Sequence, residues 1–233
     1  MTSFVRQARR RLQHYGGFVK QQNPSRDLSK LSFWSKFYKQ KITTGEPFDW
    51  FLSPETIVNT LPATDDDTIK NILHVGCGTS ELGTILKQHY PTSKVINIDY
   101  DPISIDIMKL KNPHDIYIQY DIGEEKGNDT RFSKQKFDLV VDKGTLDAVV
   151  FGGLEPTVEF LGGIEQLLST PNGTLIQYTD DPPEYRQELL KCFFTTEEGW
   201  NVSVRTILED GSETASSFND GKEHYMYSIW RKA

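Results

Sequence analysis

The sequence predicts an α/β protein whose mostly parallel, seven-stranded sheet ends in an antiparallel hairpin. Apolar runs of strand length alternate with helical segments between residues 70 and 193, which is typical of a parallel sheet that helices cover on both faces. The first apolar run breaks into a glycine turn. Two long segments of alternating polarity, 200–208 and 223–231, follow without a helix between them, which favours a hairpin at the sheet edge.

The individual elements follow from apolar spacing and from breaks at glycine, proline and acidic segments. Before the alternating region, helices are predicted at 28–41 and from Ser53 to about Leu61, separated by a break at 43–47 and followed by an acidic loop at 62–67. Strands are predicted at about 70–75, 94–99, 115–120, 137–142 and 173–179. Helices are predicted at about 80–89, 102–111, 143–150, 157–169 and 183–193.

The composition fits one globular domain and excludes several classes of function. The chain has 233 residues, of which 36% are hydrophobic, and no apolar run approaches the length of a membrane span. Its net charge of −7 argues against a general nucleic-acid binder. The two cysteines, Cys77 and Cys192, form no disulfide framework or zinc-ligand spacing, and the five histidines are scattered, so no metal site is predicted.

The positive charge is concentrated at the amino terminus. Residues 1–26 hold six basic residues and no acidic one, whereas the rest of the chain holds 20 basic and 33 acidic residues. In a helix, Phe4, Val5, Ala8 and Leu12 would share one face. Such a segment is typical of a mitochondrial presequence; a solvated basic tail or a surface helix is the alternative. We therefore expect a tail at 1–26, a single domain at 27–233, and a location in the mitochondrial matrix, with the cytoplasm as the alternative.

The glycine turn predicts a nucleotide-like ligand. A buried strand breaks at Gly76, Cys77 and Gly78 and opens a helix, an arrangement that presents backbone N–H groups and a positive helix end to a polar group. Asp99 ends the next apolar run, 21 residues past Gly78, where a carboxylate accepts the hydroxyls of a ribose. An ordinary strand–turn–helix without a ligand is the alternative.

The details of the turn favour S-adenosylmethionine over NAD or FAD. The dinucleotide pattern needs a third glycine at the position of Glu81, and Gly83 is out of register. A carboxylate beside a pyrophosphate would repel it. S-adenosylmethionine has a ribose diol and a zwitterionic amino-acid end, but no phosphate.

Further acids stand where the predicted strands end, and ligands of open α/β sheets bind at those ends. Asp121, with the Ile122 backbone, is placed to contact an adenine. Asp142 is the candidate for orienting an acceptor amine, which must be neutral to attack. Lys143 is expected to pair with Asp147, four residues on.

Aromatic side chains ahead of the glycine turn exceed what one buried face needs. Trp34, Tyr38 and Trp50 could cover the cofactor, because aromatic faces attract a sulfonium or ammonium by cation–π contact. Core packing is the alternative for all three.

Three segments, Val75–Ser80, Asn97–Asp99 and Asp142–Ala148, resemble motifs of the seven-β-strand, S-adenosylmethionine-dependent protein lysine methyltransferases. The aromatic segments resemble that family's cofactor-covering region, and the similarity spans about residues 28–231. It implies a Rossmann-like class I methyltransferase fold, with Asp142 at the catalytic edge. The implied cofactor-binding residues are Trp34, Tyr38, Trp50, Gly76, Cys77, Gly78, Asp99, Tyr100, Asp121, Ile122 and Asp142.

Within this family, the segment 173–183 and the end of the chain around Tyr225–Tyr227 are most similar to members that methylate citrate synthase in mitochondria. Members that methylate elongation factor 1A share the fourth-strand motif equally well. The resemblance therefore implies citrate synthase as protein partner, with elongation factor 1A as the alternative, and no nucleic acid, membrane or metal partner. A small-molecule methyltransferase and a catalytically silent partner subunit are the remaining alternatives.

Overall fold

The structure is a computed structural model that describes residues 2–15, 27–42, 48–62, 68–123, 132, 134–208 and 223–231. The predicted break at 43–47, most of the acidic loop at 62–67 and the hairpin connection at 209–222 lie outside these residues. None of the helices that the structure describes has the length and apolar character needed to cross a membrane.

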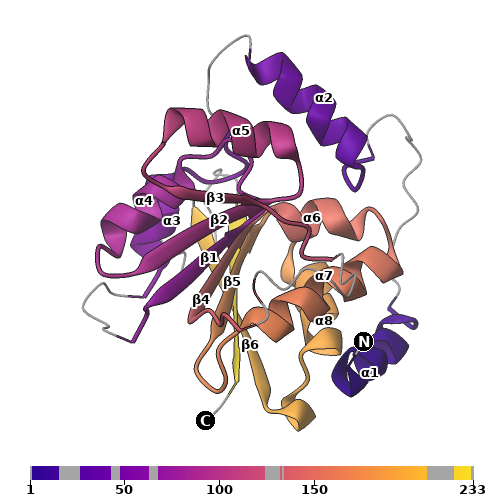
Figure 1. Ribbon diagram of the computed structural model, residues 1–233. Helices are drawn as coiled ribbons and strands as arrows, with labels where there is room; N and C mark the ends of the chain where they lie inside the picture. The colour runs from indigo at the N-terminus through magenta and orange to yellow at the C-terminus, as the bar shows by residue number, and fades with distance from the viewer. Residues whose placement is uncertain are drawn as a thin grey trace.

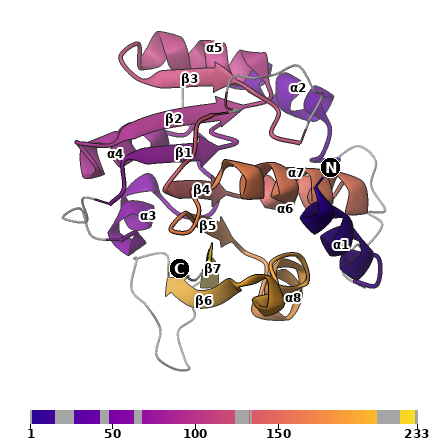
Figure 2. The ribbon, with the colours of Figure 1, turned by 60° about the horizontal axis from the view of Figure 1, so that its bottom comes forward.

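The strands form one seven-stranded sheet in the order β3-β2-β1-β4-β5-β7-β6 (Figure 1; β7 is labelled in Figure 2). Strands β1 to β5 run parallel, whereas β7 is antiparallel to both β5 and β6, as the sequence predicts. The strand bounds are β1 Asn71–Val75, β2 Lys94–Asp99, β3 Ile116–Gln119, β4 Leu139–Lys143, β5 Thr174–Thr179, β6 Trp200–Leu208 and β7 Glu223–Arg231. The strand order reverses at β1, whose neighbours are β2 and β4, and ligands of such sheets bind at this switch point.

Helices cover both faces of the sheet. Figure 2 shows α3 and α4 on one side and α6, α7 and α8 on the other. The helix bounds are α1 Ser3–Leu12, α2 Leu31–Ile42, α3 Pro54–Thr60, α4 Leu82–His89, α5 Pro102–Lys111, α6 Thr145–Val150, α7 Leu154–Leu167 and α8 Pro183–Phe193. Successive residues of a strand point to opposite faces, so Ile72 packs in the α3/α4 layer and Leu73 in the layer of α7 and α8.

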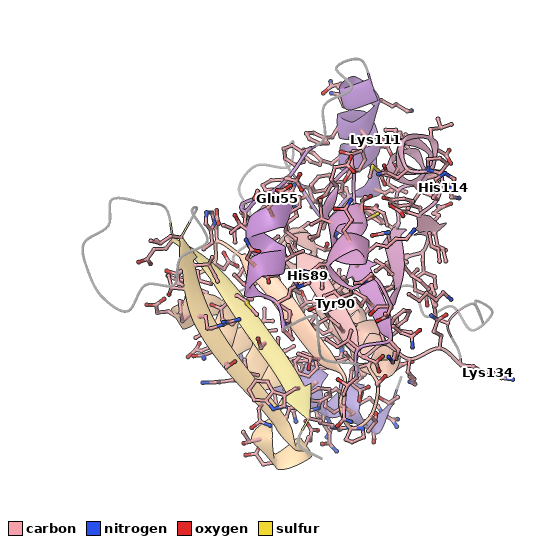
Figure 3. All side chains as sticks on the ribbon, turned by 90° about the vertical axis from the view of Figure 1, so that its left-hand side faces the viewer. Glu55, His89, Tyr90, Lys111, His114 and Lys134 are labelled. Atoms are coloured by element: carbon pink, nitrogen blue, oxygen red, sulfur yellow. The ribbon has the colours of Figure 1, made fainter. Side chains whose placement is uncertain are left out.

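The α3/α4 layer is fixed by capping and by one hydrogen bond between the two helices. Ser53 caps α3 by accepting a hydrogen bond from the Thr56 amide at 3.1 Å. Figure 3 views this side, with Glu55 in the first turn of α3 and His89 and Tyr90 where α4 ends. The Tyr90 hydroxyl donates to the Pro62 carbonyl at 2.7 Å, which joins the end of α4 to the end of α3.

The amino-terminal helix is part of the core, which the predicted boundary at residue 26 does not anticipate. Val5, Ala8 and Leu12 of α1 are buried in the same apolar cluster as the sheet, against α7 and α8. The helices α1 and α7 approach closely, because a Cβ on Gly162 would lie 3.0 Å from Val5. The apolar face predicted from sequence spacing is thus the face that packs; residues 16–26 lie outside the described part.

Several element boundaries differ by two or three residues from those predicted, and two of the differences lie at glycines. The helix expected from 143 begins at Thr145, because Lys143 completes β4 and Gly144, with φ at +80°, turns the chain. The helix expected from 157 begins at Leu154, directly after Gly153, whose φ is +86°. Glycine adopts such angles without a steric penalty, so each turn stands where a glycine does.

Candidate active site

The glycine turn after β1 contains two residues whose backbone angles lie in the left-handed region. Gly76 has φ at +59° and Gly78 at +51°. A Cβ on Gly76 would lie 2.0 Å from the Thr145 hydroxyl, and one on Gly78 would lie 2.7 Å from the Tyr38 hydroxyl. Both positions therefore require glycine for backbone conformation and for close approach.

Asp99 lies at the centre of the site. Its Oδ2 accepts a hydrogen bond from the Gly78 amide at 2.9 Å, and its Oδ1 accepts one from the Asp101 amide at 2.8 Å. Burial raises the pKa of Asp99 to about 6, although these two amides act in the opposite direction. A carboxylate offers about four lone-pair sites, so hydroxyl donors of a ligand still find acceptors here.

Two amides of the glycine turn that were expected to bind a ligand instead donate hydrogen bonds within the protein. The Gly78 amide orients Asp99, and the Cys77 amide donates to the Ile98 carbonyl at 2.9 Å. The buried Thr79 hydroxyl, by contrast, has no hydrogen-bond partner among the described residues. The turn thus fixes the Asp99 carboxylate and leaves the adjacent Thr79 hydroxyl without a hydrogen-bond partner among the described residues.

A cavity of about 210 Å³ opens above the carboxyl ends of β3, β2, β1 and β4. Ten of the eleven residues predicted to bind the cofactor line it: Trp34, Tyr38, Trp50, Gly76, Cys77, Gly78, Asp99, Tyr100, Asp121 and Ile122. Tertiary structure thus brings together residues that span positions 34 to 122 of the sequence. Their individual contacts with a cofactor stay a prediction.

The β3 end of the cavity has a largely apolar wall. Tyr120, Ile122 and Phe160 line it beside the carboxylate of Asp121, which accepts the Gly123 amide at 3.0 Å. Helix α7 lies tightly against this wall, because a Cβ on Gly163 would lie 2.1 Å from the Ile122 carbonyl oxygen. Such a wall suits the face of a purine, with a carboxylate near its polar edge.

Aromatic rings cover the cavity from the amino-terminal side. The rings of Trp34 and Tyr38 stack at 5.9 Å, and Trp34 meets Trp50 edge-on at 6.1 Å. The indole of Trp34 donates to the Leu28 carbonyl at 2.7 Å, which fixes its orientation. These rings form a small cluster of their own, separate from the main core, so they serve as cavity cover as well as packing.

Asp142 is the one predicted site residue that does not line this cavity. Its two carboxylate oxygens accept the Thr145 and Leu146 amides, at 2.8 and 3.1 Å, at the start of α6. Burial and the nearby Asp147 raise the pKa of Asp142 to about 7. The side chain therefore shapes the turn at Gly144 and meets the cavity through that turn.

Lys143 does line the cavity, and the partner predicted for it is wrong. Its buried ammonium contacts Asp49, while Asp147 binds the fully buried Arg186 at 3.1 Å. An i,i+4 pair requires both residues on one helix, whereas Lys143 belongs to β4. Lys143 and Ser80 line the cavity, although neither is among the predicted cofactor-binding residues; for Lys143, its charge within the fourth-strand motif was the available signal.

Glu81 lies outside the cavity. Its carboxylate contacts Lys111, and it accepts a hydrogen bond from the Asn112 amide group at 3.1 Å. The repulsion predicted between Glu81 and a pyrophosphate is therefore not part of this site. Among the described residues, no three His, Cys, Asp or Glu side chains gather in a way that could hold a metal ion.

The fold and cavity together define a Rossmann-like class I methyltransferase, with an acid at the end of β2 and an aromatic cover. Residues 66–227 match the family described as "Methyltransferase domain", and the chain belongs to that family. By this family the chain is a methyltransferase enzyme.

Solved structures share the fold over nearly the whole chain. The plantazolicin methyltransferase BpumL, solved in complex with a monoazolic desmethylPZN analog and SAH, superposes with a TM-score of 0.63 at 16% identity, and the match covers 98% of each chain. The TehB-like SAM-dependent methyltransferase of Corynebacterium glutamicum gives 0.54 at 19% identity, over 87% of this chain and 98% of that one.

Relatives by sequence include enzymes with named protein substrates. The mitochondrial citrate synthase-lysine N-methyltransferase of Homo sapiens is 29% identical over 201 residues, 77% of this chain and 81% of the relative. EEF1A lysine methyltransferase 4 of Mus musculus is 27% identical over 170 residues, 67% of this chain and 63% of the relative.

Proposed function

We propose that the protein transfers methyl groups from S-adenosylmethionine to a lysine side chain of citrate synthase. The observation that carries the proposal is the similarity to citrate synthase-lysine N-methyltransferases, which extends over about four fifths of those enzymes. Residues of the aromatic cover, of the glycine turn and of the segment from Lys143 to Ala148 line one cavity, which supports an enzymatic function.

The residues of the cavity have separate roles in the proposed reaction. Asp99 accepts the ribose hydroxyls, and Asp121 with the Ile122 backbone faces the adenine. Trp34, Tyr38 and Trp50 exclude water and present aromatic faces to positive charge. S-adenosylmethionine supplies an electrophilic methyl group on its sulfonium.

The protein contributes mainly position and desolvation at the acceptor end. The lysine amine must be neutral and must approach the methyl carbon opposite the sulfur, so the turn at Gly144 and the neighbouring side chains set its direction. Asp142 serves this step by holding the start of α6, and with it Gly144 and Thr145, in place. We propose that Asp142 acts through this turn, without contacting the lysine itself.

Incubation with radiolabelled S-adenosylmethionine and purified citrate synthase tests the substrate. Label on citrate synthase at a lysine, identified by mass spectrometry, is the expected result. The Asp99→Ala variant is the control and should transfer no label, because it lacks the ribose acceptor. Label on elongation factor 1A alone would contradict this substrate and would favour the second candidate function, methylation of a lysine of elongation factor 1A. The similarity to EEF1A lysine methyltransferase 4 supports that second function.

We propose a mitochondrial location, on two grounds. The first is that the citrate synthase-lysine N-methyltransferases to which the chain is similar are mitochondrial by name. The second is α1, which has Arg9, Arg10 and Arg11 in its last turn and no acid in its first. Because α1 packs into the core, we expect the imported protein to keep residues 3–12. Mass spectrometry of the amino terminus after import checks this, and a start beyond residue 12 would contradict it.

A further inference from the structure

A buried charge pair closes the β4 end of the cavity. The ammonium of Lys143 contacts Oδ1 of Asp49, and the same oxygen contacts the hydroxyl of Ser80. Ser80 in turn accepts the Leu82 amide at 3.1 Å, at the start of α4. Asp49 therefore ties the end of β4 to the glycine turn, from a segment about 90 residues ahead of Lys143 in the chain.

The backbone around Asp49 is fitted to this position. Phe51 adopts φ at +61°, which is rare for a residue with a side chain. Its ring packs directly on Gly144, where a Cβ would lie 3.0 Å from the Phe51 ring. Strain of this kind persists only where surrounding contacts impose it, and it gathers at functional sites.

Lys143 and Ser80 line the cavity, whereas Asp49 does not. The Asp49 carboxylate is thus the outer partner of two groups that face a ligand. Burial alone lowers the pKa of Lys143, and Asp49 opposes that effect. A buried ammonium left without its partner favours the neutral amine.

The position of the pair indicates what it faces. Asp121 and Asp99 stand at the ends of β3 and β2, so the nucleoside of the cofactor occupies that half of the cavity. The amino-acid end, which carries a carboxylate, then lies over β1 and β4. There Lys143 supplies a positive charge and Ser80 a hydroxyl.

We propose that Asp49 is a positioning residue, which holds the Lys143 ammonium charged and aimed, together with the Ser80 hydroxyl, at the amino-acid end of the cofactor. It acts through these two groups and sets the affinity for the cofactor. The inference rests on the proposed orientation of the cofactor and is independent of which protein is methylated.

A double-mutant cycle tests the inference with S-adenosylhomocysteine as the probe, because it keeps the amino-acid end and needs no protein substrate. Isothermal titration calorimetry at pH 7.5 gives Kd for the wild type, Asp49→Asn, Lys143→Gln and the double variant. We expect each single change to raise Kd about tenfold or more, as for a lost charge-assisted hydrogen bond. In the Lys143→Gln background, Asp49→Asn should change Kd less than about twofold.

The chain offers a matched control. Asp115 also contacts one lysine and one hydroxyl, Lys87 at 2.8 Å and Thr84 at 2.7 Å, but it lies outside the cavity. Asp115→Asn removes the same charge from the same kind of cluster. We expect its Kd to equal that of the wild type.

The pH dependence of Kd distinguishes the proposed role of Asp49 from a purely structural one, because a purely structural role would give the same loss of affinity at every pH. The titratable groups that face Lys143 are Asp49, His74 of β1 and Tyr178 of the neighbouring β5. Burial lowers the pKa of His74 to about 4, so it stays neutral between pH 6.5 and 9.5. Tyr178, whose pKa burial raises, also stays neutral. In Asp49→Asn, the ratio of its Kd to that of the wild type should therefore rise with pH, as Lys143 loses its proton.

Several outcomes would overturn the inference: a wild-type Kd for Asp49→Asn or for Lys143→Gln, an equal loss from Asp49→Asn in both backgrounds, or a Kd ratio that is constant with pH. If Asp49→Asn does not fold, Ser80→Ala removes one of the two contacts of Asp49. It should raise Kd about threefold, by weakening one hydrogen bond, and an unchanged Kd there would equally refute the proposal. Failure of citrate synthase to accept methyl groups would leave these binding results as they are.

Discussion

Two helices that precede the sheet in the sequence, α1 and α2, have similar composition and opposite functions. Both contain several basic residues and no acidic residue. Helix α1 buries small and aliphatic side chains in the main core, against α7 and α8. Helix α2 packs on α5, away from that core, and two of its aromatic rings, those of Trp34 and Tyr38, line the cavity. Figure 1 shows the two helices at separate corners of the molecule.

The difference teaches that the kind of apolar side chain, and not the charge, separates a fold-completing helix from a site-covering one. Val5, Ala8 and Leu12 have no polar atom in their side chains and pack closely. Trp34 and Tyr38 carry a polar group on a large ring, which suits a wall that is apolar toward a ligand and hydrogen-bonded behind. Changes near α1 should therefore affect stability, and changes near α2 should affect binding.

The largest effect is expected for Trp200→Ala in the α1 region. Trp200 is buried, and its ring lies 6.4 Å from that of Phe4 in α1. Loss of a buried tryptophan should lower the free energy of unfolding by about 3–5 kcal/mol. Urea denaturation measures this, and the folded variant should keep the wild-type Kd for S-adenosylmethionine.

Trp50→Ala makes the same substitution in the α2 region and sharpens the comparison. Trp50 is half-buried and lines the cavity. Loss of its cation–π contact should weaken cofactor binding by about 0.5–2 kcal/mol, with a smaller loss of stability than Trp200→Ala causes. If Trp50→Ala instead destabilises the fold as much as Trp200→Ala, the separation of the two regions fails.

Leu12→Ala tests α1 directly. Leu12 is fully buried in the main core, so the cavity left by its side chain should cost about 2–5 kcal/mol of unfolding free energy. Thermal and urea unfolding, each with and without cofactor, check the prediction. A variant that melts like the wild type would show that α1 is dispensable for the fold.

Acidification should affect the site before it affects the α1 contacts. The pKa of Asp99 is raised to about 6, and its protonated form loses acceptor capacity for ribose hydroxyls. Binding should be at full strength well above pH 6 and should fall as pH drops below it, approaching about tenfold per unit. Calorimetry across pH 5 to 8 measures this for S-adenosylhomocysteine. Asp99→Asn should bind weakly at every pH, and a similar slope in that variant would assign the titration to another group.

The smallest effect is expected at the rim of α1. The ion pair of Arg9 with Glu155, at 2.5 Å, is exposed on both sides, and exposed pairs contribute little to stability. Glu155→Gln should leave the unfolding midpoint and the cofactor Kd unchanged. A marked shift in the midpoint would mean that α1 is held by charge rather than by its buried face.

The sequence predicts the sheet well, because period-two apolar runs and glycine breaks are local signals. All seven strands form where predicted, within a few residues, and the glycine turn and Asp99 line the same cavity. The side-chain partners were harder to predict. Lys143 was assigned to Asp147 from helical spacing, but β4 extends one residue further and carries the lysine toward Asp49.

The side-chain direction of Asp142 also escapes sequence reasoning. Neighbours along a strand point to opposite faces, so Lys143 faces the cavity and Asp142 faces the start of α6. A shift of one residue in the strand end exchanges the two roles. Sequence motifs mark both residues without deciding between them.

The amino-acid order alone determined the α/β class, the parallel sheet with its terminal hairpin, and the positions of the glycine turn and of Asp99 at the end of β2. These depend on spacing along the chain, which short-range sterics and hydrophobic periodicity impose. Only the tertiary structure decided that α1 joins the core, that Asp49 partners Lys143, and that Arg186 partners Asp147. Those pairings depend on which distant segments share one buried, low-dielectric volume, and no local pattern specifies that.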